Sequence, residues 1–209
     1  TVKSQSNSKI ESIVRNATLK IYEDPDKAIH IGKAIYNDKN NSTADRLRGL
    51  TLMADGYSSK RDYKKSLEYV IKANHLADKI NDPIVKIKIL NKLAAHYQQL
   101  KIYEKAIAFL DESERMCLKY PVQDSVKFLL GNGYIIRGFI YKDQLNCEIA
   151  INYYLKGIKQ YQGFDQNLVN PNSSIAHYNI GNCYTLMGNY ALAKKSFNQS
   201  IDFAKKINA

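Results

Sequence analysis

The pattern of apolar positions along the chain favours helices throughout. Apolar and small residues recur on one helical face. For example, Phe197 and Ser200 follow Ala193 by four and seven residues. The strict alternation that indicates half-buried strands is nearly absent. The pattern predicts ten helices, at about 8–22, 25–37, 42–60, 62–80, 83–101, 103–119, 122–143, 147–162, 171–188 and 190–207.

Most prolines stand where a helix should begin. Pro25, Pro83 and Pro171 each follow an Asp or Asn. An Asp or Asn side chain can accept a hydrogen bond from a free amide at a helix start, and Pro in the first turn has no amide hydrogen to satisfy. Pro121 follows Tyr120 and begins another link. We therefore expect no proline inside a helix.

The helical pattern also repeats, about every forty residues. In each copy a small residue is followed three residues later by Tyr, and a second helix then carries a small residue at a fixed offset. The small residue of the second helix stands at 66, 106, 150 and 193, in steps of 40, 44 and 43, and a weaker copy centres on position 28, a step of 38. The paired positions in the first helices are Ala54 with Tyr57, Ala94 with Tyr97, Gly138 with Tyr141, and Gly181 with Tyr184.

This arrangement resembles the tetratricopeptide repeat family. The best copy places Gly181 and Tyr184 before the Gly188 turn, followed by Ala193 and Phe197. The period exceeds the usual length of about 34 residues and is similar to that of bacterial regulatory tetratricopeptide proteins. The resemblance implies an all-α fold, a right-handed α-α superhelical solenoid of about five helix hairpins. It implies one domain over 1–209, with repeats at about 8–40, 42–81, 82–120, 122–165 and 170–207.

Some positions depart from the family pattern. Arg137 stands where Leu or Ile is expected, and His177 stands where Trp or Leu is usual. In the first copy, Arg15 and Asn16 replace apolar and small residues, so we interpret that copy as a degenerate cap. Gly131 and the neighbouring Gly133 predict a flexible or kinked helix start.

The two ends suggest that the native protein continues. The chain begins without Met and has no apolar signal segment. The last helix carries Ile201 and Phe203 with no further helix to cover them, although a terminal repeat normally has a polar outer side. We expect either more chain or a partner at this end. The alternative is that the polar side is already supplied by Lys194, Lys195, Asn198 and Lys205.

No catalytic or cofactor-binding motif is present. Phosphate-binding loops, a nucleophile elbow and paired metal ligands are missing, so we expect a non-enzymatic protein without a cofactor or metal. Cys117, Cys147 and Cys183 are widely separated in the sequence, which argues against a dithiol site and favours a reducing compartment. The acidic run 111–114 is expected to be solvated, and the four histidines are expected at helix surfaces or interfaces.

The resemblance also implies a groove lined by the first helix of each repeat. Amides there can pair with a peptide backbone, Arg48 and Lys88 can hold a carboxylate, and Ile135, Phe139 and Tyr178 can take an apolar anchor. The alternative is that these residues are merely solvated. The candidate contacts are Arg48, Thr51, Lys88, Asn91, Gln98, Ile135, Phe139, Tyr178 and Asn182, on stripes that also hold Asp55, Ser58, Ala95, Gln99, Asn132, Lys142 and Thr185.

The formal net charge of +11 bears on the partner. Residues 1–105 hold 20 Lys and Arg against 12 Asp and Glu. An acidic protein or peptide partner is one interpretation of this excess, and a solvated Lys-rich face is the more common one. We therefore expect a protein- or peptide-binding module, as the sensing or interaction part of a bacterial transcriptional regulator or sensor kinase. Two alternatives stay open: a nucleic-acid-binding helical repeat, disfavoured because Asp55 and Asp143 interrupt the stripes, and a scaffold that self-associates through 190–207. No apolar run is long enough to span a membrane.

Overall fold

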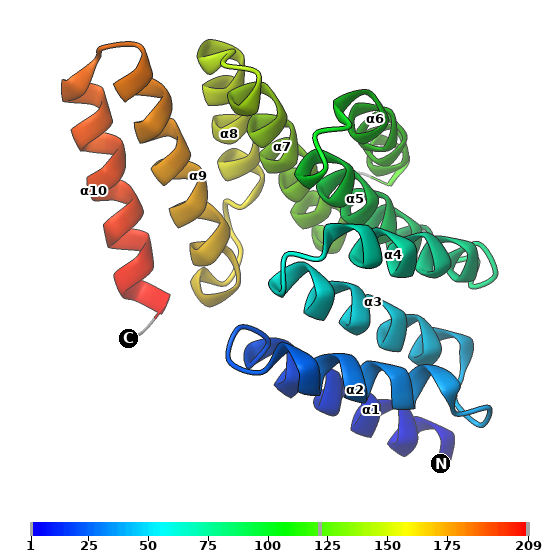
Figure 1. The fold of residues 1–209 in the computed structure, drawn as a ribbon. Helices are drawn as coiled ribbons and strands as arrows, with labels where there is room; N and C mark the ends of the chain where they lie inside the picture. The colour runs from blue at the N-terminus through cyan, green and yellow to red at the C-terminus, as the bar shows by residue number, and fades with distance from the viewer. Residues whose placement is uncertain (1, 121–122, 208–209) are drawn as a thin grey trace. The chain divides into compact units, whose positions relative to one another are not determined.

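The computed structural model describes the backbone of residues 2–120 and 123–207, and the side chains of 9–120, 123–165 and 168–206. Every regular element in this part of the chain is a helix (Figure 1). The helices are α1 (Val2–Leu19), α2 (Pro25–Asn37), α3 (Thr43–Ser59), α4 (Tyr63–Ala77), α5 (Pro83–Gln99), α6 (Tyr103–Lys119), α7 (Asp124–Asp143), α8 (Cys147–Gln160), α9 (Gln166–Leu186) and α10 (Tyr190–Ile207).

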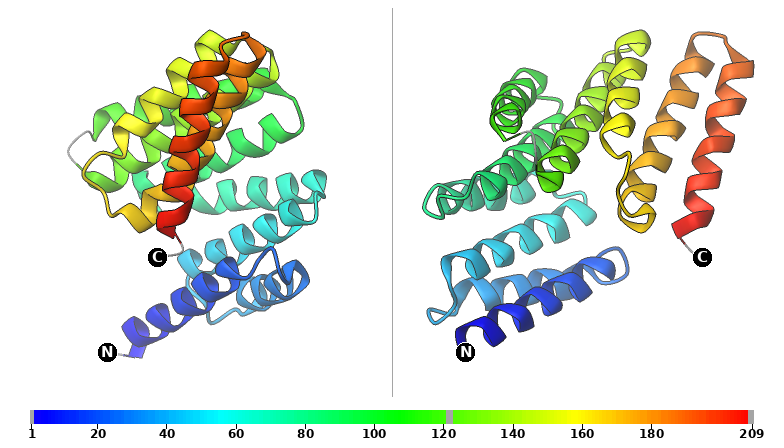
Figure 2. Two further views of the ribbon diagram at one scale, coloured as in Figure 1. Left: turned by 90° about the vertical axis from the view of Figure 1, so that its left-hand side faces the viewer. Right: turned by 180° about the vertical axis from the view of Figure 1, so that it is seen from behind.

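The chain divides into two compact units, which we call unit 1 (1–102) and unit 2 (103–209). The division falls between α5 and α6, inside the third predicted repeat. In unit 1, helices consecutive in the chain pack together, and α1 also contacts α3. In unit 2, α7 pairs with α8 and α9 with α10, and α7 also contacts α9. Figure 2 shows α9 and α10 side by side as an antiparallel pair. A single continuous array over 1–209 stays a prediction.

Two of the predicted helix starts are confirmed. Asp24 caps α2 by accepting a hydrogen bond from the amide of Lys27 at 2.9 Å. Asp82 caps α5 by accepting from the amide of Ile84 at 2.8 Å. In both helices the proline is the first helical residue, where its missing amide hydrogen removes no helical bond. The predicted link at Pro121 lies outside the described residues.

The predicted start of α9 is wrong. The helix begins at Gln166, so Pro171 lies inside it and Asn170 is a buried helical residue instead of a cap. A proline this close to the start of a helix removes only one backbone hydrogen bond, in the N-terminal part of the helix. The burial of Val169 and Asn170 holds the preceding turn in the helix, a tertiary contact that helix-start signals do not report. The first helix also differs, since it ends at Leu19 and not at 22.

The hairpin turns repeat as regularly as the helices. One residue in each turn has a positive φ: Arg61 (61°), Lys101 (59°), Leu145 (62°) and Gly188 (76°). The amide of the following residue donates to the carbonyl of the residue five positions before it, which is the 6→1 hydrogen bond of a Schellman motif. That carbonyl always belongs to the repeat tyrosine, and the N–O distances are 2.9, 2.8, 2.8 and 2.8 Å for Tyr57, Tyr97, Tyr141 and Tyr184. The predicted register is therefore present in the backbone hydrogen bonds.

The small residues lie where the two helices of a hairpin cross. A Cβ added to Gly138 would lie 2.5 Å from the ring of Tyr154, and one added to Gly181 would lie 2.5 Å from the ring of Phe197. In unit 1, the backbone at the equivalent Ala54 accepts a 2.6 Å hydrogen bond from Ser66 of α4. In the α7–α8 and α9–α10 hairpins, the aromatic ring at the crossing therefore comes from the second helix.

Arg137, which departs from the family pattern, is buried and pairs with two acidic residues of α6. Its Nη2 lies 2.6 Å from Asp111 Oδ1 and 3.2 Å from Glu114 Oε2 on α6. Tyr134 donates a 2.9 Å hydrogen bond to the same glutamate, and burial followed by this bond raises the pKa of Tyr134 to about 12. The interpretation of 111–114 as a solvated acidic run holds for Asp111, whose side chain is 64% exposed although it pairs with Arg137. Glu114 is only 32% exposed and binds both Arg137 and Tyr134 of α7.

One further interpretation changes in unit 2, and the three cysteines are free and buried. Gly131 and Gly133 lie in the middle of α7 and are buried, so they do not form a helix start. Cys147 and Cys183 come together in one core cluster at the packing of α8 on α9. Burial first, and then the neighbouring Cys147 thiol, raise the pKa of Cys183. Their spacing in the sequence concealed this contact. Within the described residues, no helix is both long and apolar enough to cross a membrane.

The positive φ of Gly188 can be tested by its effect on stability. Gly188→Ala should lower the free energy of unfolding by about 1 kcal/mol, because a Cβ is disfavoured at positive φ. No atom lies within 4 Å of that Cβ, so a clash cannot contribute. Gly188→Asn is the matched control and should lose less, since Asn tolerates this conformation. Urea unfolding measures both, and an unchanged midpoint for the alanine variant would contradict this account of the turn.

The buried arginine predicts an asymmetric response. Arg137→Met should change the free energy of unfolding by no more than about 1 kcal/mol, because the carboxylates of Asp111 and Glu114 can still reach water. Neutralising both partners, with Asp111→Asn and Glu114→Gln, should cost about 3 kcal/mol because the guanidinium then stays buried without a counter-charge. Urea midpoints compare the two proteins. Equal losses would show that packing alone, without the ion pairs, holds α6 on α7.

Candidate binding site

The first helices of neighbouring hairpins face one another through polar side chains, and we call this surface the first-helix face of each unit. In unit 1, Lys92 Nζ lies 2.5 Å from Asp55 Oδ1 between α5 and α3. In unit 2, the Lys142 ammonium donates to the Asn179 amide oxygen at 2.9 Å between α7 and α9. Asp55 and Lys142 lie on the predicted stripes, whereas their partners Lys92 and Asn179 do not. Adjacent first helices therefore contact each other through charged and amide groups.

The predicted cations of unit 1 gather on this face. Arg48 pairs with Asp45 at 2.8 Å and, at 3.9 Å, with Glu11 on α1. Lys88 is exposed as a residue, yet partial desolvation of its ammonium, followed by the nearby Lys92, lowers its pKa. The cations of α3 and α5 are thus close enough to influence one another, with only part of their charge balanced by carboxylates.

The uncharged candidates of unit 1 are less available. Thr51 is half-buried and donates its hydroxyl to the backbone carbonyl of Arg48 at 2.9 Å. Gln98 is half-buried as well. Asn91 is 5% exposed, so the expectation that its amide reads a peptide backbone is wrong.

The apolar anchor predicted in unit 2 is also wrong in part. Ile135 is buried against Gly157 of α8, and Phe139 packs edge-on against Tyr154 with ring centroids 5.6 Å apart. Both residues therefore belong to the hairpin core, because that side of α7 is turned toward α8. Tyr178 is 54% exposed and leans on Phe197 of α10, and Asn182 is half-buried. Tyr178 alone among the predicted anchors offers a large exposed ring.

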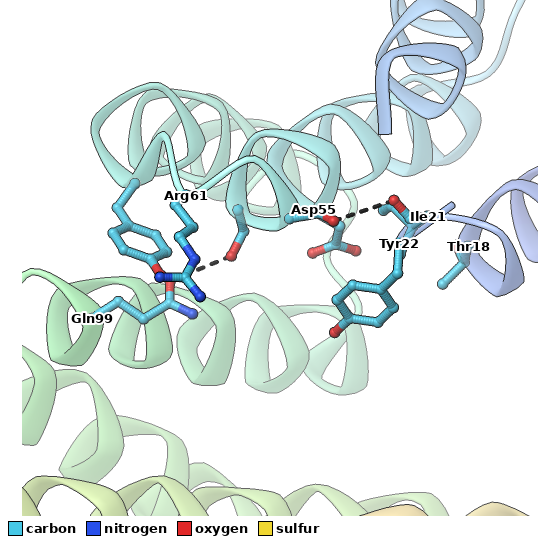
Figure 3. Close-up of a pocket in the computed structure, with 9 residues that line it drawn as sticks. Thr18, Ile21, Tyr22, Asp55, Arg61 and Gln99 are labelled. Atoms are coloured by element: carbon cyan, nitrogen blue, oxygen red, sulfur yellow. Dashed lines mark hydrogen bonds between the residues drawn. The ribbon is translucent and has the colours of Figure 1, made fainter. Parts of the chain in front are cut away.

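A pocket of about 570 Å³ opens where α1, α3 and α5 end in unit 1 (Figure 3). Its wall combines the ends of the first helices with the turns that follow them. Three lining residues, Asp55, Ser58 and Gln99, lie on the predicted stripes. Three others, Ile21, Tyr22 and Arg61, come from turns, which helical periodicity does not report. The lining residues are Thr18, Ile21, Tyr22, Asp55, Ser58, Ser59, Arg61, Tyr63 and Gln99.

The side chain of Gln99 is oriented by a hydrogen bond to the buried His96. The Nδ1 of His96 lies 3.1 Å from Gln99 Oε1 and 3.2 Å from the hydroxyl of Ser66. Ser66 donates its own proton to the carbonyl of Ala54, and Ser58 approaches Gln99 Oε1 at 3.5 Å. Because Oε1 is occupied on the protein side, the amide NH₂ is the group that Gln99 can offer to the pocket.

The charges of the pocket are unequal. Asp55 is compensated by Lys92 at 2.5 Å. Arg61 is exposed and extends from the turn after α3 toward Gln99 (Figure 3), and its guanidinium has no ion pair in the described part of the chain. Tyr22, 87% exposed, stands on the other side. The pocket therefore presents a free cation and several neutral donors.

His96 links this region to pH. The residue is 4% exposed, and burial first, then the nearby Lys92, lower its pKa to about 4, while Asp55 opposes the shift. The unfolded chain therefore takes up a proton at this position between about pH 6.5 and 4 and the folded chain does not. Stability falls as the pH drops through that window. The neutral imidazole that orients Gln99 is the form present at pH 7.

We expect the free energy of unfolding to fall by about 3 kcal/mol between pH 7 and pH 4 because of His96 alone. The comparison is with His96→Gln, in which every other titrating group, including His177, is retained. The difference between the two unfolding free energies should narrow toward acid pH, as measured by urea titration at each pH. Parallel curves would mean that His96 does not stay neutral in the folded protein.

Comparisons with known proteins address the fold. Residues 174–206 match the sequence model of the tetratricopeptide repeat family. No curated protein sequence matches the chain. Aspartyl phosphate phosphatase F from Bacillus subtilis has a similar structure, with a TM-score of 0.70 and 16% identity over 100% of this chain. This chain spans 57% of that protein.

Two other solved structures match most of both chains. BtubC (BKLC) from P. vanneervenii aligns with a TM-score of 0.64 and 14% identity, over 99% of this chain and 89% of that one. The apo form of RapI aligns with a TM-score of 0.62 and 15% identity, over 96% and 82%. At these identities the likeness establishes the fold.

Residues 174–206, which lie in the α9–α10 hairpin, therefore match a tetratricopeptide repeat. The described chain is all-α, and its fold class is that of the α-α superhelical solenoids with which it aligns.

Proposed function

We propose that this chain is a protein-interaction module that binds an extended peptide segment along the first-helix face of unit 1. The observation that carries the proposal is the continuity of that face: Arg48, Lys88 and Lys92 lie on α3 and α5, and the 570 Å³ pocket opens where the same helices end. Amide and hydroxyl groups in the pocket can satisfy a peptide backbone, and the cations favour an acidic sequence.

The wider role that we propose is the interaction part of a bacterial regulator. The lengthened repeats support it, and so does the fold shared with aspartyl phosphate phosphatase F from Bacillus subtilis and with RapI. This proposal assigns no catalytic step to the chain.

The two other hypotheses gain no support from the side chains. Phe203 stacks on His177 of its own hairpin with centroids 5.4 Å apart, so it is not free for end-to-end association. Ile201 is half exposed among polar neighbours on α10. Several lysines are engaged by carboxylates or by aromatic rings, as Lys86 is by Asp78, which does not favour a nucleic-acid surface.

A peptide selection tests the proposal. Random linear peptides displayed on phage are selected on the intact chain, and the enriched peptides are measured by fluorescence anisotropy. Peptides rich in Asp and Glu should be enriched, and Lys88→Glu should weaken their binding at least about 10-fold, or 1.4 kcal/mol. Lys64→Glu makes the same charge change on the exposed surface of α4 and should leave binding within about twofold.

Failure to enrich any peptide, or an equal loss in the Lys64 and Lys88 variants, would contradict binding at the first-helix face. Preferential binding of a mixed RNA pool that survives moderate salt would favour the nucleic-acid alternative instead.

A further inference from the structure

We infer that Cys147 and Cys183 form a redox-sensitive pair, whose oxidation to a disulfide covalently joins the two helix hairpins of unit 2. The inference goes beyond the proposed function, because it concerns the contact between these hairpins and not the first-helix face. Cys147 is the first residue of α8, and Cys183 lies near the end of α9. Both are free thiols, and both belong to one core cluster.

The path of the chain places the two cysteines side by side. A short link joins α8 to α9 and the two helices pack together, so they run antiparallel and the start of α8 lies beside the end of α9 (Figure 1). Ala150, one turn after Cys147, and Ile180, one turn before Cys183, belong to the same cluster. The Cys147 thiol is also a hydrogen-bond partner of the Cys183 thiol. Contact between two thiols is the first requirement for a disulfide between them.

The third cysteine provides an internal contrast. Cys117 lies on α6 and is buried as well. Its thiol makes a hydrogen bond to Ser113 on the same helix, and not to another cysteine. Burial is therefore common to all three thiols, whereas side-chain contact with a second thiol distinguishes Cys147 and Cys183.

The disulfide would reinforce the contact between hairpins. Within the α7–α8 and α9–α10 hairpins, a Schellman turn already fixes the two helices. Between the hairpins, Tyr154 of the same cluster has a buried hydroxyl without a hydrogen-bond partner among the described residues. Burial first, and then the Cys183 thiol, raise the pKa of Tyr154, which places this hydroxyl near α9. A buried hydroxyl without a partner gains hydrogen bonds to water on exposure, so it favours local opening of α8 from α9.

The closed pair is protected from oxidants. Cys183 is 0% exposed and Cys147 is 8% exposed. Burial, followed by the hydrogen bond to Cys147, raises the pKa of Cys183 to about 12, so this thiol is not ionised at pH 7. The thiolate is the reactive form of cysteine, so oxidation requires that α9 first move away from α8. The pair therefore responds to an oxidant only when the hairpins separate.

Hydrogen peroxide is an oxidant that balances the reaction. In the open state, the thiolate of one cysteine attacks a peroxide oxygen and breaks the O–O bond, which gives a sulfenic acid and hydroxide. When the hairpins close, the second thiol attacks the sulfenic sulfur, forms the S–S bond and releases water. The proton of the first thiol converts the hydroxide to water. Two thiols thus lose two electrons and two protons, and one peroxide becomes two waters.

Peroxide treatment of the intact chain tests the inference. After the reaction, the remaining thiols are alkylated in denaturant and the chain is mapped by mass spectrometry. The expected product is a monomer with a Cys147–Cys183 disulfide and an alkylated Cys117. Urea below the unfolding transition should raise the rate of disulfide formation at least about threefold, because local opening limits the reaction.

The oxidised chain should unfold at a higher urea concentration than the reduced chain, because the disulfide constrains the unfolded chain. Dithiothreitol should reverse this shift by thiol–disulfide exchange. Amide hydrogen exchange in α9 should slow on oxidation, whereas exchange in α3 of unit 1 should not change.

Three variants complete the test. Cys183→Ala removes one thiol of the pair and should abolish the shift in urea midpoint and the change in exchange. Cys147→Ala should do the same, and it serves if the Cys183 variant does not fold. Cys117→Ala is the matched control, since it removes a buried cysteine outside the pair, and it should respond to peroxide as wild type does.

Three results would overturn the inference. The first is the absence of a Cys147–Cys183 disulfide in chains that stay folded. The second is a main product that involves Cys117 or joins two chains. The third is a disulfide that leaves the urea midpoint and the exchange of α9 unchanged. No peptide takes part in these measurements, so their failure and the failure of the proposed function are separate outcomes.

Discussion

Close contact between paired helices is the constraint on which the rest of the structure depends. At Gly138 and Gly181 the neighbouring ring lies 2.5 Å from the place a Cβ would occupy, so a larger residue would push the helices apart. The turn that follows is fixed by a left-handed residue and by a hydrogen bond to the repeat tyrosine. Together the crossing and the turn set the rotation of each helix, and hence which side chains face the neighbouring hairpin.

That rotation determines the chemistry of the first-helix face. The apolar sides of the helices pack inside the hairpins. Polar groups such as Asp55 and Lys92 therefore form the contacts between adjacent first helices. Ion pairs and amide hydrogen bonds hold this face together, and some of its hydrogen-bond donors remain exposed. The pocket in unit 1 forms where this face ends, because the turns after α1 and α3 contribute Tyr22 and Arg61.

Some buried polar residues of the first helices are matched by a partner on another helix, whereas His177 Nδ1 and the side-chain amide of Asn170 have no hydrogen-bond partner among the described residues. Arg137 is buried against Asp111 and Glu114 of α6, and His96 is buried against Ser66 of α4. An unpaired buried charge or amide would be costly, so such residues require these particular neighbours. They make the contacts between hairpins more specific than apolar packing alone would.

The amino-acid sequence by itself determined the helical class, the forty-residue register and most helix boundaries, because these depend on local periodicity, caps and small residues. Three residues of the predicted stripes, Asp55, Ser58 and Gln99, line the pocket of unit 1. Tertiary structure decided the rest. Ile135 and Phe139 turned toward α8. Burial carried α9 past Pro171, and distant turns brought Arg61 beside Gln99. These outcomes depend on the rotation of packed helices and on contacts between residues far apart in the chain, which no local pattern encodes.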